Sequence, residues 1–328
     1  MLASIILAVV AQTMQPAATI YYDPSGATDL HSQATVFYDA ATSIPASGRQ
    51  VLVYGRGGGF LPTSGDCPQT LSAGDPILDD WLADGNIVVA FGYTVSDPTI
   101  VGKGCFNPDA WPRVPGDHPR LDVTQVGWRH AELDAVNLIQ HLETFGLPTI
   151  PGARALSGSI VGYGDSVATY ALQWAAYYDR STLDPSAPAR FHADTRLRAL
   201  ILSNAQSSFE SYKQTLSILP HFLDSHGNAA DPLGASDPTE RRDASPLWYG
   251  RNSGPKPPIY AFGNAVIVGS APWDWYGFQH VLLGSQVHSS SHVLALETLP
   301  GHDAASVFDT TQTGAAARAS ASAWLSSL

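Results

Sequence analysis

The sequence predicts an α/β protein whose central sheet is mostly parallel and covered by helices on both faces. Short runs of β-branched and apolar residues alternate with helical patterns along most of the chain, and this alternation is typical of parallel sheets. Of the 328 residues, 44% are hydrophobic and 14% are charged. A chain of this composition can bury a large core, which excludes disorder and a small disulfide-stabilised scaffold.

The expected elements follow in strand–helix order. Strands are expected where β-branched and apolar residues cluster, at residues 50–54, 86–93, 155–163, 197–203, 258–263 and 292–299. Helices are expected at residues 79–82, 122–145, 168–178 and 313–328. The longest of them has apolar residues at helical spacing, including Leu133, Val136 and Ile139, and Gly146 is placed to end it.

Residues 19–328 are expected to form a single domain with two irregular insertions. The insertions, at residues 98–119 and 206–257, are rich in Pro, Gly and Asp. Long irregular segments in a compact domain tend to be functional loops or lids.

An apolar N-terminal run predicts export. Residues 1–11 (MLASIILAVVA) are too few for a membrane span, which needs about 20 apolar residues. They fit a secretory signal cleaved after Ala11 or Ala18, so residues 1–18 are interpreted as a signal or N-terminal extension. The alternative is a buried strand. Export predicts a secreted or periplasmic protein, in which Cys67 and Cys105 are able to form one disulfide.

The charge and composition of the chain exclude some classes of binding partner. The chain has 17 Lys and Arg against 29 Asp and Glu, a formal net charge of −12, and no basic run. A surface this acidic repels phosphate backbones, so nucleic acid is excluded as a partner. No Cys and His cluster has the spacing of a metal site, so no metal is expected.

The sharpest motif is GDSVA at residues 164–168, between an expected strand and an expected helix. A nucleophile at a tight strand-to-helix turn needs small residues two positions before and after it. Gly164 and Ala168 meet this need around Ser166, and the N–H of Val167 is a candidate oxyanion donor. An alternative register places Gly164 at the nucleophile position.

Two further motifs complete the pattern. Residues 56–60 (RGGGF) directly follow a predicted strand, and successive glycines allow backbone N–H groups to point at a developing oxyanion. The alternative is a flexible turn. Residues 299–303 (LPGHD) follow the last predicted strand, where His302 is placed to act as general base.

In this order, the motifs resemble those of the α/β-hydrolase superfamily. From residue 50 to the C-terminus the chain is most similar to carboxylesterases related to hormone-sensitive lipase and to bacterial feruloyl or acetyl-xylan esterases. The resemblance implies Ser166 as nucleophile and His302 as base. It implies an oxyanion hole formed by the N–H groups of Gly58, Gly59 and Val167, and no cofactor.

The chain departs from the family pattern at the catalytic acid. The family position, counted from Gly263, is occupied by Val266. Asp274, on the segment after the same strand, is the first alternative, and Glu210, beyond the preceding strand, is the second. Arg56 also replaces the histidine that the family carries before its glycines.

Substrate contacts are expected from the motifs and from an aromatic cluster. Arg56, Phe60 and Asp165 are assigned to substrate binding. Trp273 and Trp275 are assigned to stacking on an aryl group or a sugar ring, with a core role as the alternative. The predicted activity is hydrolysis of carboxylic esters, in particular aryl, feruloyl or sugar-linked esters, through an acyl-enzyme. The alternatives are a non-catalytic binding protein with the same fold and a lipase or polyester hydrolase.

Overall fold

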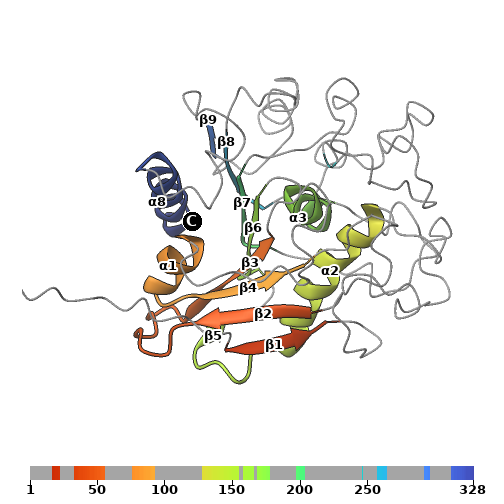
Figure 1. Cartoon of the computed structure of the whole chain (residues 1–328), viewed down its shortest axis with the longest axis vertical. Coiled ribbons are helices and arrows are strands. Elements are labelled where there is room, and N and C mark those ends of the chain that lie inside the picture. The colour runs from red at the N-terminus through yellow and green to blue at the C-terminus, as the bar shows by residue number, and fades with distance from the viewer. Residues whose placement is uncertain are drawn as a thin grey trace, which may run out of the picture.

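A central β-sheet with helices on both faces organises the chain (Figure 1). The computed structural model describes residues 17–22, 33–55, 76–92, 128–154, 158–165, 168–177, 197–203, 246, 257–263, 292–295 and 312–328. The described strands are β1 (Ala18–Tyr21), β2 (Gln33–Tyr38), β3 (Arg49–Gly55), β4 (Ile87–Phe91), β5 (Ala153–Arg154), β6 (Val161–Asp165), β7 (Ala199–Ser203), β8 (Ile259–Gly263) and β9 (His292–Ala295). The described helices are α1 (Pro76–Ala83), α2 (Trp128–Phe145), α3 (Ala168–Tyr177) and α8 (Gln312–Ser326).

The strand order confirms the predicted, mostly parallel sheet. The order is β1-β2-β4-β3-β6-β7-β8-β9, and the short β5 pairs with β3 outside this path. Strands β4, β3, β6, β7, β8 and β9 pair in parallel. Strands β1 and β2 form an antiparallel edge next to β4. Strands β1 and β2 were not predicted from the sequence.

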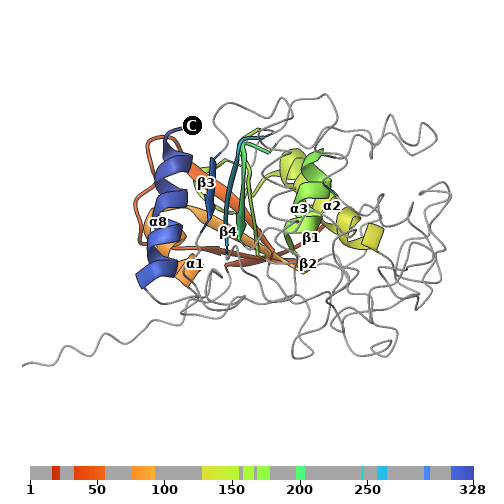
Figure 2. The same ribbon diagram turned by 90° about the horizontal axis from the view of Figure 1, so that it is seen from above.

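Each face of the sheet has its own apolar core. One core packs α2 and α3 against the sheet and includes the fully buried Trp174. The other packs α1 and α8 against the opposite face and includes Trp81 and Leu325. Figure 2 shows the two helix pairs on opposite sides of the strands. Burial on both faces is why the central strands read as continuous apolar runs in the sequence.

The predicted elements are confirmed over the described residues with small shifts at their ends, except for one strand. Residues 122–127 and 296–299, which were also expected in a helix and a strand, lie outside the described residues. The strand expected at residues 155–163 is wrong in its first part, because Gly158 and Ser159 form a turn with a φ of 74° at Gly158 and β6 begins only at Val161. The expected end of α2 is confirmed. Gly146 has a φ of 64°, and its N–H donates to the Leu142 carbonyl at 2.9 Å.

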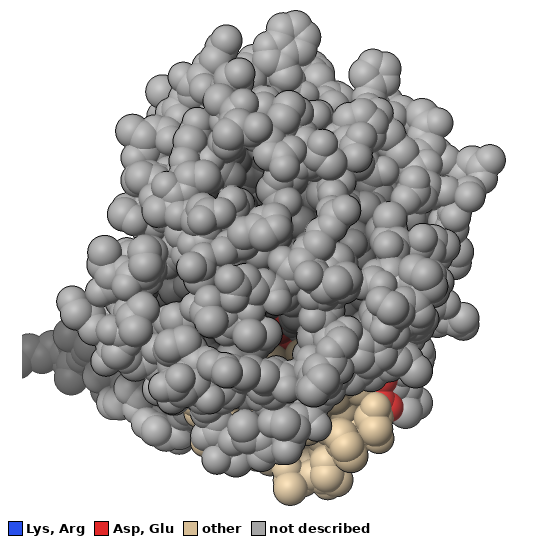
Figure 3. Space-filling view, turned by 90° about the vertical axis from the view of Figure 1, so that its right-hand side faces the viewer, with Lys and Arg blue, Asp and Glu red and all other residues tan. Residues whose placement is uncertain are grey.

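Two observations concern the outside of the molecule. Within the described residues, no helix has both the length and the apolar character needed to cross a bilayer. On the face drawn in Figure 3, the described residues that are visible lie mainly in the lower part and are mostly uncharged.

A buried arginine joins two turns at the amino-terminal end of β3. Arg49 is 2% exposed. Its guanidinium donates to the carbonyl oxygens of Gly85 at 2.6 Å and Thr42 at 2.8 Å, and it lies 5.5 Å from the centre of the Tyr38 ring. Asp39 holds Thr42 in place by accepting its hydroxyl hydrogen bond at 2.7 Å, and this hydrogen bond lowers the pKa of Asp39.

Replacing Arg49 by methionine is expected to lower the free energy of unfolding by about 2–4 kcal/mol, because one buried and one partly buried carbonyl group lose a charged donor. Urea unfolding followed by circular dichroism measures the change. The matched control is Arg154→Met, at an exposed position of β5, which is expected to stay within about 0.5 kcal/mol of the wild type. Equal effects of the two substitutions would contradict the role of Arg49.

Candidate active site

The predicted site residues follow the carboxyl ends of neighbouring parallel strands. Residues 56–60 follow β3, Ser166 follows β6, Glu210 comes after β7, Asp274 after β8 and His302 after β9. Parallel strands direct their carboxyl ends to the same edge of the sheet, and this edge is where open α/β sheets bind ligands. The register aligns the ends of β3 and β6, since Gly55 pairs with Gly164.

Most of the predicted site side chains lie outside the described residues. These are Arg56, Gly58, Gly59, Phe60, Ser166, Val167, Glu210, Val266, Trp273, Asp274, Trp275 and His302. Their assignments therefore stay predictions. The described residues define the framework that holds the ends of these segments.

The turn that carries Ser166 is short and tightly packed on both sides. Strand β6 ends at Asp165 and α3 begins at Ala168, so Ser166 and Val167 are the only residues between them. A Cβ atom added at Gly164 would lie 3.1 Å from both Cα and N of Thr169, closer than an ordinary contact. The first turn of α3 thus approaches the strand so closely that a side chain at position 164 would displace Thr169 by a few tenths of an ångström.

The strand assignment of Gly164 would place the nucleophile of the alternative register inside the sheet. Gly164 pairs with Gly55 on one side and with Leu202 on the other, inside the sheet. A nucleophile at that position would belong to the sheet rather than to the turn. Of the two candidate nucleophile positions, 164 and 166, only Ser166 falls between strand and helix.

A second close contact explains why position 168 carries a small residue. Its partner, Gly55, was not among the residues singled out from the sequence. Ala168 is fully buried. A Cβ atom added at Gly55 would lie 2.9 Å from the Ala168 Cβ and 3.1 Å from Phe91 Cε1. Gly55 therefore leaves room for the side chain of Ala168 where the two segments meet. The available signal was a glycine that ends an otherwise β-branched strand directly before the RGGGF segment.

Asp165 lies on the face of the sheet that is covered by α1 and α8. Side chains alternate along a strand, so Asp165 shares a face with Tyr163. Asp165 is 4% exposed and Tyr163 is 3% exposed. Burial raises the pKa of the Tyr163 phenol well above its usual range, and the negative charge of Asp165 raises it further. The assignment of Asp165 to substrate binding stays a prediction.

The described residues contain no candidate metal site and neither of the two cysteines. Within the described ranges, no three His, Cys, Asp or Glu side chains are grouped so that they could hold a metal ion. Cys67 and Cys105 lie outside those ranges, so their pairing stays a prediction.

The sheet order, the parallel strands from β4 to β9, the two-sided helix packing and the tight turn after β6 together define the α/β-hydrolase fold. Solved structures agree with this fold. Thermogutta terrifontis esterase 2, phosphoramylated by tabun, matches with a TM-score of 0.60 and 15% identity over 97% of each chain. Esterase B from Lactobacillus rhamnosis matches with a TM-score of 0.63 and 12% identity, over 96% of this chain and 84% of that one.

A third structure, the butyrate-bound form of the Thermogutta esterase, matches with a TM-score of 0.57 and 17% identity over 90% of this chain and 88% of the other. No protein-family model matches the sequence, and a search of curated proteins found no significant match. At these identities the structural likeness establishes the fold.

Proposed function

We propose that the protein is a serine hydrolase that cleaves carboxylic esters. The observation that carries the proposal is the position of Ser166, in a two-residue connection between β6 and α3 that is bounded by the close contacts of Gly164 and Ala168. A serine in this position exposes its hydroxyl at the carboxyl edge of the sheet. The Thermogutta and Lactobacillus proteins with a similar fold are esterases. This similarity supports ester hydrolysis as the reaction.

In the proposed mechanism, the Ser166 Oγ attacks the ester carbonyl while His302 accepts its proton. The N–H groups of Gly58, Gly59 and Val167 stabilise the oxyanion of the tetrahedral intermediate. His302 then returns the proton to the leaving alcohol, and water releases the acyl group from Ser166 by the same steps in reverse. Asp274 is proposed to orient His302, with Glu210 as the alternative acid.

The substrate class is a finer proposal. Trp273 and Trp275 add aromatic surface to the segment after β8, which favours aryl, feruloyl or sugar-linked esters. The Thermogutta esterase has been solved with butyrate bound, so short acyl chains are the first substrates to test. A lipase or polyester hydrolase differs from this proposal only in the shape of its pocket.

The experiment that tests the function combines covalent labelling with hydrolysis. Purified protein is expected to react with a fluorophosphonate probe at one serine, to be located by peptide mass spectrometry at Ser166, and to hydrolyse p-nitrophenyl butyrate. A folded protein that neither takes the label nor hydrolyses the ester contradicts the proposal and favours a non-catalytic binding protein. Labelling elsewhere in the chain assigns the reaction to another serine.

We also propose that the protein is exported and that its signal is cleaved after Ala11. The N–H of Ala17 donates to the Val36 carbonyl at 2.8 Å, and Ala18 pairs with Val36 as the first residue of β1. Cleavage after Ala18 would remove Ala17 and Ala18 and so shorten this edge strand. Cleavage after Ala11 leaves β1 whole.

N-terminal sequencing of the protein recovered from the periplasm or culture medium is therefore expected to begin at Gln12. A mature chain that begins at Thr19 would contradict the cleavage position. Protein retained in the cytoplasm with Met1 in place would contradict export.

A further inference from the structure

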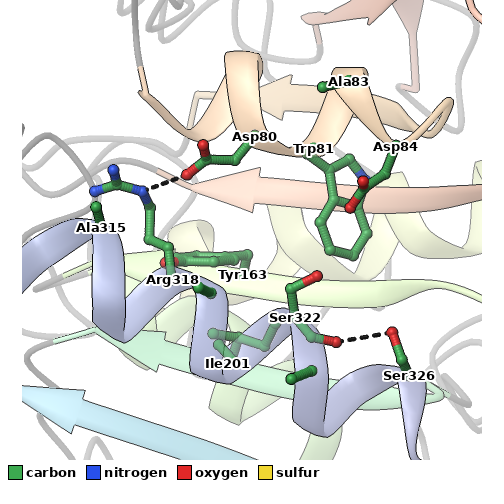
Figure 4. A pocket seen from close by; sticks show the side chains of 13 residues that line it. Asp80, Trp81, Ala83, Asp84, Tyr163, Ile201, Ala315, Arg318, Ser322 and Ser326 are labelled. Atoms are coloured by element: carbon green, nitrogen blue, oxygen red, sulfur yellow. Dashed lines mark hydrogen bonds and ion pairs between the residues drawn. The ribbon is translucent and has the colours of Figure 1, made fainter.

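A cavity of about 580 Å³ lies between α1 and α8, on the face of the sheet opposite α3. Figure 4 shows Asp80 and Trp81 of α1 and Asp84 of the turn after α1 on one side of it and Ser322 and Ser326 of α8 on the other, with Tyr163 and Ile201 of the sheet between them. Its lining includes the exposed residues Asp84, Ala319 and Ser326, so the cavity opens to solvent. This cavity falls within the size range of small-molecule sites.

The walls of the cavity are held in place by contacts of their own. The Trp81 indole N–H donates to the Ile87 carbonyl at 3.2 Å, which fixes the ring against β4. Arg318 Nε lies 2.6 Å from Asp80 Oδ2, and this ion pair ties α8 to α1. Arg318 is 8% exposed and Asp80 is 57% exposed, so the ion pair joins a buried guanidinium to a carboxylate at the surface. The cavity is therefore bounded by fixed elements.

The chemistry of the lining selects the occupant. Trp81, Tyr163 and Ile201 give it a buried, largely aromatic floor, and α8 contributes alanine and serine side chains. The charged lining residues are Asp80, Asp84 and Arg318. Because Arg318 is paired with Asp80, the lining keeps one net negative charge, that of Asp84. An aromatic floor beside a carboxylate suits a cation with an apolar body.

We propose that this cavity binds a small organic amine that carries one positive charge and an apolar or aromatic body. The ammonium group would face Asp84, and the body would lie between Trp81 and the small side chains of α8. The site is separate from the proposed ester-hydrolysing site, because the cavity lies on a face of the sheet and the predicted catalytic residues follow the ends of its strands.

The test uses 2-phenylethylammonium as the probe and neutral 2-phenylethanol as its uncharged analogue, titrated calorimetrically into the full chain. The amine is expected to bind with one-to-one stoichiometry and more tightly than the alcohol. Asp84→Asn is expected to weaken amine binding about threefold to fivefold, the size of an exposed ion pair, and to leave alcohol binding unchanged. Equal binding of amine and alcohol to the wild type would overturn the charge selection.

A second test fills the cavity with a larger side chain. Ala319 is exposed and lines the cavity, whereas Ala316 is exposed on the same helix and does not line it. Ala319→Phe is expected to abolish amine binding and Ala316→Phe to preserve it, with unchanged circular dichroism spectra for both. Protein blocked by the fluorophosphonate label is expected to bind the amine like unlabelled protein. No binding to the wild type, or binding that survives Ala319→Phe, would overturn the site.

Discussion

Replacing Ser166 by alanine is expected to lower kcat/KM for p-nitrophenyl butyrate by at least about 10⁴-fold and to abolish fluorophosphonate labelling. The substitution removes the one oxygen that forms the acyl-enzyme, and the oxyanion hole and binding contacts alone retain only a small part of the catalysis. Alanine fits the turn between β6 and α3 because it is smaller than serine, so the fold is expected to persist. The measurement is steady-state hydrolysis together with a thermal unfolding curve.

Ser203→Ala is the matched control, since Ser203 ends β7 beside Asp165 and loses the same hydroxyl group. It is expected to keep kcat/KM within about threefold of the wild type, because a buried hydroxyl that takes no part in the reaction affects mainly stability. A Ser166→Ala protein that retains most of its activity would show that another residue is the nucleophile. Comparison of Asp274→Asn with Glu210→Gln then identifies the acid, as the larger loss marks the residue that orients His302.

A single methyl group at Gly164 is expected to lower kcat by about 3- to 10-fold. The added Cβ would lie 3.1 Å from the Thr169 Cα and N atoms, and these backbone atoms can relieve the contact only if the start of α3 moves. That movement, by a few tenths of an ångström, is expected to displace Ser166 and the N–H of Val167 together. A displacement of about 1 Å costs enzymes roughly 100-fold in rate, so this smaller shift is expected to cost less. Kinetics of Gly164→Ala with a short-chain ester measure the effect.

Gly162→Ala is the control on the same strand and the same face. Its added Cβ would meet Leu200 Cδ2 at 2.7 Å and Leu197 Cδ1 at 3.3 Å, which are the ends of side chains that can rotate away. A lower melting temperature with an unchanged kcat is expected. If both substitutions affect kcat equally, the tight packing behind Ser166 has no catalytic role and the glycine is needed only for stability.

The central strands were predictable because their signal is local. Strands β3, β4, β7 and β8 are runs of apolar residues bounded by glycine, proline or polar residues, and burial on both faces makes such runs continuous. The end of α2 was predictable for a similar reason, since Gly146 adopts a backbone conformation that other residues avoid. The GDSVA motif was visible because the tight turn restricts residues only two positions apart.

Other features were hidden because they depend on partners far away in the sequence. Strands β1 and β2 are defined by their antiparallel pairing with each other and with β4. The apolar run before β6 was read as strand although Gly158 turns the chain there. Arg49 directly precedes the strand predicted at residues 50–54, and only its hydrogen bonds to Thr42 and Gly85 show why a charge is buried at that position.

The sequence by itself determined the fold class, the central strands with the helices that cover them, and the place of Ser166 between one strand and the next helix, since these follow from residues close together in the chain. The tertiary structure decided the order of the strands, the contact between Gly55 and Ala168, and the cavity between α1 and α8. These features arise where residues far apart in the chain pack against one another, and packing at that range leaves no periodic signal in a single sequence.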